Sequence, residues 1–438
     1  MTGRRLPFIL CLILAFTTQG SAQSGFGPIP AIVPDPGSIP PIVQNPSPLP
    51  IIVQIQPSAN INNIASFLKG TVVDSIPSAS TYLLSVGLPL PALTPLSHRL
   101  GINWLEVNSA VSIPDIALLN TVTIPDTVAS DWYKNQPAWQ LIESQSAQAY
   151  STGTGVVVAD INTQVDHSHP ALIGHLTSGY DFIATRPSGS TSINQSEAGF
   201  IDQSEAGYID QSEAGFIDGI GGVLGLPDLT QNPAYGHGTL CAGVIAAIAP
   251  DSMIMPLRAF DANGQSDLFT LAKAIRYAVA NGAQVINMSF GAPSPSNALQ
   301  SAIQYAQMNN IILVASAGND NTSSPQYPAG YSGVLAVAAT DLFDHKASFS
   351  NYGSTIFVDA PGVNIISAYP QDSYAIVSGT SFSAPAVAGT AALVRSLRWN
   401  GAANAIARGA VNIDSRNANY AKQLGYGRID VLHSVKPK

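Results

Sequence analysis

The sequence predicts an α/β fold in which a doubly wound, mostly parallel sheet is flanked by helices. Short apolar runs bounded by Gly, Asn or Asp are typical of buried parallel strands, and they recur at 156–161, 284–288, 311–315 and 334–338. Between these runs, apolar residues follow a helical spacing at 268–279 and 297–308. Because strands and helices alternate, functional residues are expected beyond the carboxyl ends of the strands.

The composition limits the kinds of partner. The chain has 438 residues, 46% of them hydrophobic, which is enough for a large core with accessory segments. A formal net charge of −9 argues against a nucleic-acid surface. No apolar stretch reaches the roughly 20 residues that a membrane span requires. We therefore expect neither a nucleic-acid partner nor a membrane span.

Residues 1–22 have the pattern of a secretory signal peptide. Two arginines precede an apolar run at 6–16, and small residues follow at 20–22. The alternative is a buried helix of the mature fold. Cleavage of the signal would remove Cys11 and leave Cys241 as a lone thiol, so we expect no intrachain disulfide. This pattern predicts a secreted, extracytoplasmic protein.

Two segments precede the predicted α/β domain. Residues 23–58 are rich in Pro, Ile and Val and carry little charge, which favours an extended linker. Residues 59–108 are predicted to form a small α+β module. Apolar positions at helical spacing indicate a helix at 61–68, and strands are expected at 71–76 and 81–86.

Residues 195–218 repeat the unit Gln-Ser-Glu-Ala-Gly-Phe/Tyr-Ile-Asp three times. We interpret this insertion as a solvated loop that has grown by repetition. Its carboxylates could bind a hard cation such as calcium, but the dense alternation of oxygen ligands that calcium loops contain is absent. We therefore predict no metal site and no required cofactor, with calcium as an unsupported alternative.

The most informative motif is Gly-Thr-Ser-Phe-Ser-Ala-Pro at 379–385, followed by an alanine-rich run that predicts a buried helix. A tight backbone that opens a helix can present the Ser381 hydroxyl and a backbone N–H at one place. Serine needs a base because its free hydroxyl is a poor nucleophile, and the candidate is His237, between Gly236 and Gly238. A third motif, Ala317-Gly318-Asn319, ends an apolar run.

In order and context these motifs resemble those of the subtilisin-like serine peptidases (subtilases, peptidase S8), over roughly residues 130–435. The resemblance implies a subtilisin-like peptidase domain at 130–438, with Ser381 as nucleophile and His237 as general base. It also implies an oxyanion hole formed by Asn319 and the Ser381 N–H, although Gly-Asn is also a common turn pair. The module at 59–108 resembles the inhibitory propeptide of the family, which makes it an expected partner of the domain.

The same resemblance implies the residues that bind a polypeptide substrate. Ser289-Phe290-Gly291 and Ser316-Ala317-Gly318 match the segments that line the specificity pocket of the family. Neither carries a charge, so the pocket is expected to prefer an apolar or aromatic side chain. Gly264-Gln265-Ser266 matches an edge strand to which a substrate could add as an extra strand. Ser266 replaces the usual glycine and is expected to narrow the groove.

The position of the catalytic acid departs from the family pattern. The family has Val-Ala-Val-Ile-Asp-Thr-Gly before a His-Pro pair, where this chain has Val-Ala-Asp-Ile-Asn-Thr-Gln at 158–164. This register places Asn162 at the aspartate position, whereas a gapped register would make Asp160 the acid. An amide carries no charge, and it can turn its NH₂ toward His237 and favour the wrong tautomer. Loss of this acid lowers the rate about 10⁴-fold in serine peptidases, one subtilase included.

The predicted function is that of a secreted serine endopeptidase, weakened by Asn162, that forms an acyl-enzyme on Ser381. The alternative is a catalytically impaired pseudo-peptidase that binds peptides, or has a structural role, through the same groove. Asn162, Gln164, Asp160 and Ser266 together favour this alternative, because each departs from the family pattern.

Overall fold

The computed structural model describes residues 48–87, 100–114, 117–122, 132–185, 234–398 and 401–436. The predicted signal peptide, residues 23–47 of the predicted linker and the repeat at 195–218 lie outside this part of the chain. The described residues all belong to one compact unit. No helix among them has the length and apolar character that a membrane crossing requires.

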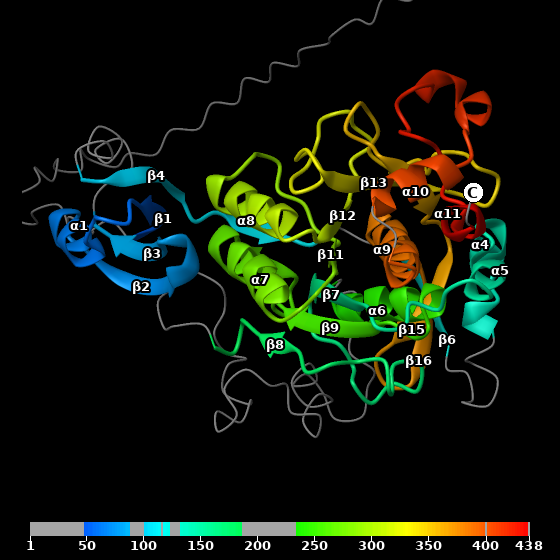
Figure 1. Ribbon diagram of the computed structural model, residues 1–438, viewed down its shortest axis with the longest axis horizontal. Helices are drawn as coiled ribbons and strands as arrows, with labels where there is room; N and C mark the ends of the chain where they lie inside the picture. Colours follow the sequence, from blue (N-terminus) through cyan, green and yellow to red (C-terminus); the bar gives the residue numbers. More distant parts are fainter. Residues whose placement is uncertain are drawn as a thin grey trace, which may run out of the picture. The chain divides into compact units, whose positions relative to one another are not determined.

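A parallel sheet of seven strands forms the centre of the fold, in the order β14-β13-β12-β11-β7-β9-β8 (Figure 1). From β7 the chain continues to β8 and β9 on one side, and from β11 it continues to β12, β13 and β14 on the other, so the carboxyl ends of β7 and β11 meet at the switch point, where α/β sheets bind their ligands. Four of the seven strands confirm the sequence prediction, β7, β11, β12 and β13. The bounds are β7 (Val157–Asn162), β8 (Tyr180–Asp181), β9 (Met253–Arg258), β11 (Val285–Met288), β12 (Ile312–Ser316), β13 (Val334–Thr340) and β14 (Val358–Pro361).

Helices cover both faces of the sheet, with α6 (His237–Ile248) and α9 (Thr380–Ser396) on one face and α7 (Leu268–Ala280) and α8 (Asn297–Met308) on the other. Consecutive strand residues alternate between two cores, because Val158 belongs to the α6/α9 core and Ala159 to the α7/α8 core. The helices predicted at 268–279 and 297–308 are therefore confirmed.

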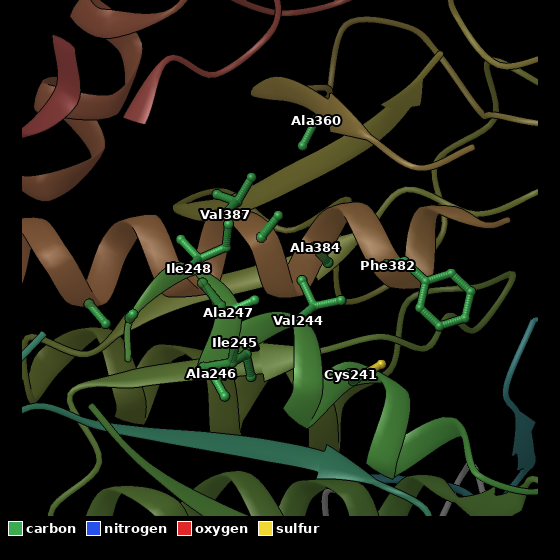
Figure 2. Packing of buried hydrophobic residues seen from close by; sticks show 14 of the residues in the cluster. Cys241, Val244, Ile245, Ala246, Ala247, Ile248, Ala360, Phe382, Ala384 and Val387 are labelled. Atoms are coloured by element: carbon green, nitrogen blue, oxygen red, sulfur yellow. The ribbon is translucent and has the colours of Figure 1, made fainter. Parts of the chain in front are cut away.

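Close packing of α6 against α9 depends on small side chains (Figure 2). Val244 and Ile248 of α6 point toward α9, whereas Val387 of α9 points to the other side, toward Ala360. A Cβ added at Gly389 of α9 would come within 2.8 Å of the Ile248 Cβ, so the two helices can approach this closely only because that position is glycine.

The N-terminal module is a four-stranded antiparallel sheet in the order β2-β3-β1-β4, covered by a short helix. Its helix and two predicted strands appear where the sequence places them. The predicted linker at 23–58 is wrong at its C-terminal end, because 49–55 forms the buried strand β1. The two prolines that suggested a linker stand at 48 and 50, where a strand tolerates them. The elements are β1 (Leu49–Ile55), α1 (Ile61–Phe67), β2 (Gly70–Ile76), β3 (Thr81–Val86) and β4 (Ile102–Val107).

After the module, two short strands pair with strands of the α/β domain. Strand β5 (Ala110–Ser112) runs antiparallel to β10 (Gln265–Asp267), and β6 (Ala117–Val122) runs antiparallel to β16 (Ser373–Ser378). Strand β16 also pairs with β15 (Ile365–Tyr369). The remaining elements are the helices α4 (Pro137–Leu141), α5 (Ser144–Gln148), α10 (Ala402–Gly409) and α11 (Val431–Val435), and the 3₁₀ turns Pro77–Ala79, Asp414–Arg416 and Ala418–Tyr420.

Candidate active site

The first residue of α6 is His237, which is fully buried beside the carboxyl end of β7. Gly236 precedes it with φ of 75°, a left-handed conformation that favours glycine. A Cβ on Gly238 would come within 2.5 Å of the Thr163 carbonyl oxygen, so this glycine lets the helix reach the end of the strand. The two glycines that flank His237 in the sequence therefore place the imidazole at the switch point of the sheet.

Ser381 lies in the first turn of α9, and Pro385 determines which groups donate hydrogen bonds to the Ser381 carbonyl oxygen. Proline has no N–H, so the Ser381 carbonyl lacks the helical donor that position 385 would supply. The Ser289 hydroxyl donates to this carbonyl at 2.9 Å, and the Cys241 thiol at 3.4 Å. Ser289 and Cys241 thus hold the turn that carries the nucleophile, and the buried thiol has a structural contact there.

Asn162 ends β7, and its Oδ1 lies 2.6 Å from His237 Nδ1. The same oxygen accepts a hydrogen bond from the Thr163 backbone N–H at 2.9 Å. On the other side, Asn162 Nδ2 donates to both oxygens of Asp160, at 3.2 and 3.3 Å. The register that aligns Asn162 with the family aspartate is therefore the one that the structure adopts, and Asp160 stands one hydrogen bond behind it.

This geometry fixes the tautomer of His237. A backbone N–H can only donate, so the contact with the Thr163 N–H requires Asn162 to turn Oδ1 toward it, which leaves Nδ2 facing Asp160. His237 Nδ1 then carries the proton that it donates to Oδ1, and Nε2 keeps the lone pair that a general base needs. The prediction that the amide presents its NH₂ to His237 is wrong, because the Thr163 N–H holds it the other way.

Burial dominates the electrostatics of this cluster. It lowers the pKa of His237 to about 3, which keeps the imidazole neutral. Burial also raises the pKa of Asp160 to about 7, although hydrogen bonds from Asn287 and Asn162 act in the opposite direction. The Cys241 thiol has a pKa well above its ordinary value, again through burial, and is not a nucleophile.

The two atoms that must exchange a proton are left without hydrogen bonds. Among the described residues, Ser381 Oγ and His237 Nε2 are buried and have no hydrogen-bond partner. Contacts between a catalytic serine and its base are often long in free enzymes and shorten when substrate binds. Asn162 therefore holds the imidazole through Nδ1, while Nε2 and the Ser381 hydroxyl remain available for proton transfer.

The asparagine predicted for the oxyanion hole is held by the residue before the nucleophile. Asn319 Oδ1 accepts hydrogen bonds from the Thr380 N–H at 3.0 Å and from its hydroxyl at 2.8 Å. Because Oδ1 is engaged in this way, the donor end of the amide points away from Thr380. Gly318 adopts φ of 105° to make the turn, as only glycine does readily. This arrangement suits Asn319 to donate to an oxyanion.

The edge strand predicted to bind substrate already carries a peptide strand. Residues Gln265–Asp267 pair with Ala110–Ser112, and the Ile113 N–H donates to the Gly264 carbonyl at 2.9 Å. Ser266 is opposite Val111 in this ladder and is fully buried. The serine therefore leaves room for an added strand, so the predicted narrowing does not close the groove.

A cavity of about 560 Å³ lies next to Asn319, and Gly291, Asp320 and Gln326 contribute to its lining. Of the predicted pocket residues, Ser289, Phe290, Ser316 and Ala317 are buried and do not line this cavity. A Cβ added at Gly291 would come within 2.2 Å of Gln326 Oε1, so this glutamine packs against the wall that the glycine forms. Gln326 Nε2 also donates to the Asp320 carboxylate.

Of the six residues predicted to line an uncharged specificity pocket, only Gly291 lines this cavity, so that pocket stays a prediction. Asp320 and Gln326 make the cavity itself polar. Asp320 directly follows Asn319 in the sequence, and this adjacency was the signal that could have revealed it. No such signal in the sequence pointed to Gln326, because it lies in the loop between β12 and β13 and only the folded loop brings it to the cavity.

No cluster of three or more His, Cys, Asp or Glu side chains suited to a metal ion occurs in the part of the chain that the structure describes. The calcium alternative concerned the repeat at 195–218, which lies outside that part. The side chains that form the candidate site described above are a serine, an imidazole and two amides.

Comparisons with known proteins agree with this geometry. A family model described as the subtilase family matches residues 153–427. Thermitase from Thermoactinomyces vulgaris is 33% identical over 310 residues, covering 68% of this chain and 94% of that protein. A thermophilic serine proteinase from Bacillus sp. (strain AK1) is 34% identical over 327 residues, with coverages of 73% and 71%.

One solved structure supports the fold. The crystal structure of fervidolysin from Fervidobacterium pennivorans, described as a keratinolytic enzyme related to subtilisin, matches with a TM-score of 0.67 at 23% identity. The match covers 90% of this chain but only 61% of that chain. On the match to the family model, the similarity to thermitase and the geometry of the site, the chain belongs to the subtilase family of serine endopeptidases.

Proposed function

We propose that the chain is a secreted serine endopeptidase that acts through an acyl-enzyme on Ser381. The observation that carries this proposal is the 2.6 Å contact between His237 Nδ1 and Asn162 Oδ1, which leaves Nε2 as an acceptor. Secretion rests on the signal-like pattern of residues 1–22.

The chemistry proceeds in two steps. Ser381 Oγ attacks the carbonyl carbon of the substrate while its proton passes to His237 Nε2, and Asn319 and the Ser381 N–H stabilise the oxyanion. When the C–N bond breaks, the leaving amine takes this proton. Water then gives a proton to His237 and attacks the acyl-enzyme, which releases the carboxylic acid and restores the serine.

Activity is expected to be lower than that of an enzyme with aspartate at 162, but not absent. The amide sets the correct tautomer and lacks only the negative charge that stabilises the imidazolium. In serine peptidases in which replacing the acid also gives the histidine the wrong tautomer, kcat falls by a factor of about 10⁴. We therefore expect Asn162→Asp to raise kcat, by less than this factor.

The polypeptide substrate is proposed to enter by strand addition, and residues 110–122 support this. Strand β5 pairs with the edge strand β10, and β6 pairs with β16, which leads directly into the Gly379-Thr380-Ser381 turn. A peptide that paired with both strands would pass Ser381 between them. The chain thus presents its own segment as a substrate would be presented.

We further propose that the N-terminal module is an inhibitory propeptide, and its contacts with α7 and α8 support this. The Glu106 carboxylate accepts from the Ser296 hydroxyl and from the Asn297 and Ala298 N–H groups, at 2.8 to 2.9 Å. It therefore caps the N-terminus of α8, where a negative charge is favourable. Lys273 of α7 pairs with Asp74 of the module at 2.8 Å.

Cleavage that releases the module is expected at a peptide bond between Ser112 and Ala117, because β5 ends and β6 begins there. Full-length protein and a Ser381→Ala variant would be incubated in parallel, and the N-terminus of the larger product sequenced. Processing of the active protein alone, within this window, is the expected result. A cut elsewhere, or equal processing of Ser381→Ala, would contradict this assignment.

The peptidase proposal is tested by labelling with a fluorophosphonate probe and by turnover of casein, after the module has been released. Ser381→Ala should abolish both, because the probe needs the activated hydroxyl. The alternative, a pseudo-peptidase, is favoured by the missing charge at Asn162. It predicts no labelling at any pH in the wild type and recovery in Asn162→Asp.

A further inference from the structure

A buried chain of polar side chains ends at the carboxylate of Asp160. This residue is fully buried, and it accepts hydrogen bonds from Asn162 Nδ2 and, at 2.8 Å, from Asn287 Nδ2. Burying a carboxylate is costly unless it is paired or well hydrogen-bonded.

The nearby charged groups offer Asp160 no ionic partner. Arg258, whose backbone is next to Asn162 in the neighbouring strand, pairs with Asp181 at 3.1 Å. The titratable side chains of α6 near Asp160 are His237 and Cys241, and burial keeps both of them neutral. When it is ionised, Asp160 is therefore a negative charge without an ionic partner among the described residues, two hydrogen bonds away from the imidazole.

Building on the peptidase function proposed above, we propose that Asp160 is a positioning residue that acts on His237 through the amide of Asn162. Its carboxylate can only accept, so it holds the NH₂ of Asn162 away from His237 and leaves Oδ1 to accept the Nδ1 proton. Its negative charge also stabilises the imidazolium as it forms. The two tasks of a triad acid are thus divided between Asn162, which makes the contact, and Asp160, which carries the charge.

This division predicts an unusual dependence of activity on pH. With burial raising the pKa of Asp160 to about 7 and lowering that of His237 to about 3, Asp160 is the group of the cluster that titrates near neutrality. Above this pKa the carboxylate is ionised and supports His237. Below it, the neutral acid supplies no charge and can donate to Asn162. We expect kcat to fall as the pH drops through about 7.

The decisive variant is Asp160→Asn, which removes the charge and preserves the shape. We expect kcat to fall about 10- to 100-fold at pH 8 with KM little changed, because one charge near the imidazolium is lost and the substrate groove is intact. The fall in kcat below neutral pH should disappear as well. Asp359→Asn is the matched control, since Asp359 is equally buried but lies on the edge strand β14.

A double-mutant cycle separates this role from a structural one. In Asp160→Val, substituting Asn162→Asp should raise kcat at least about 100-fold, because the pair restores a direct acid. In the wild-type background the same substitution should change kcat less than about 10-fold, because Asp160 already supplies the charge. Equal gains in the two backgrounds would overturn the proposal, as would wild-type kcat and pH dependence in Asp160→Asn.

Two further measurements keep the outcome unambiguous. The ¹⁵N chemical shifts of His237, recorded in the Ser381→Ala background, should indicate the Nδ1–H tautomer at pH 8. With Asp160→Val added, they should indicate a mixture of tautomers. An unchanged tautomer, together with an unchanged kcat of Asp160→Val in protein that retains Ser381, would contradict the proposal. Wild type that is never labelled at Ser381 would refute the peptidase function itself. Labelled wild type with an unaffected Asp160→Asn would refute only the role of Asp160.

Discussion

At the scale of residues, a single exchange of an oxygen for an NH₂ group distinguishes Asn162 from an aspartate. The consequence depends on the neighbours, because the Thr163 N–H and the Asp160 carboxylate leave the amide one way to satisfy all its contacts. The residue type was predictable from the sequence motif. The direction of the amide was not, because it depends on the polarity of atoms that only the folded strand brings together.

The raised pKa of Asp160 also predicts how stability changes with pH. An acid whose pKa is higher in the folded state than in the unfolded state stabilises the fold when protonated, and this contribution is lost as the pH rises through the folded pKa of about 7. Between pH 5 and 8 the free energy of unfolding of wild type should therefore fall by up to about 3 kcal/mol relative to Asp160→Asn. Urea unfolding of both proteins, in the Ser381→Ala background to prevent autolysis, measures this difference. A difference that is independent of pH would contradict it.

Gln326 and Asp320 should determine which side chain the cavity accepts. Gln326→Ala removes the side chain that packs against Gly291, so kcat/KM for peptides with a large aromatic residue before the scissile bond should rise about 10-fold. Asp320→Asn should instead lower kcat/KM for a basic residue at that position, also by about 10-fold, with aromatic substrates unaffected. Competition between peptide pairs measures both. Unchanged ratios of kcat/KM between the competing peptides would show that other residues determine the specificity.

At the scale of elements, the candidate catalytic groups are positioned by two helix starts and one strand end. His237 begins α6, Ser381 lies in the first turn of α9, and Asn162 ends β7. The strands and helices of the α/β domain were predictable because continuous apolar runs and helical spacing are strong signals. Strand β1 was missed because its prolines resemble a linker. Strand β5 was missed because a strand of three residues is defined by its pairing partner. Strand β6 was missed as well.

Packing of α6 against α9 leads to a prediction at this scale. Gly389→Ala should lower the free energy of unfolding by about 1–2 kcal/mol, because the gain in helix propensity is smaller than the overpacking against Ile248. The Ser381→Ala background again excludes autolysis. Gly87→Ala is the control, since a Cβ there meets nothing within 4 Å. A stabilised Gly389→Ala protein would show that the two helices separate without penalty.

At the scale of the whole molecule, the module and the domain are held together by capped helices and a shared strand pairing. If Glu106 supplies much of this attachment, Glu106→Ala should weaken inhibition by the separated module about 10-fold or more, because three hydrogen bonds to α8 are lost. Processed enzyme would be titrated with purified module of either sequence. An unchanged inhibition constant would assign the attachment to β5 and β10 instead.

The pairing of β5 with β10 gives dilution an unexpected effect. If the module inhibits as proposed, β5 of the intact chain is tethered beside β10 at an effective concentration in the millimolar range, which micromolar substrate does not overcome. One cut converts this tethered contact into an ordinary bimolecular equilibrium. Processed protein should therefore be more active per molecule when it is dilute, and a concentrated preparation should remain latent long after every molecule has been cleaved.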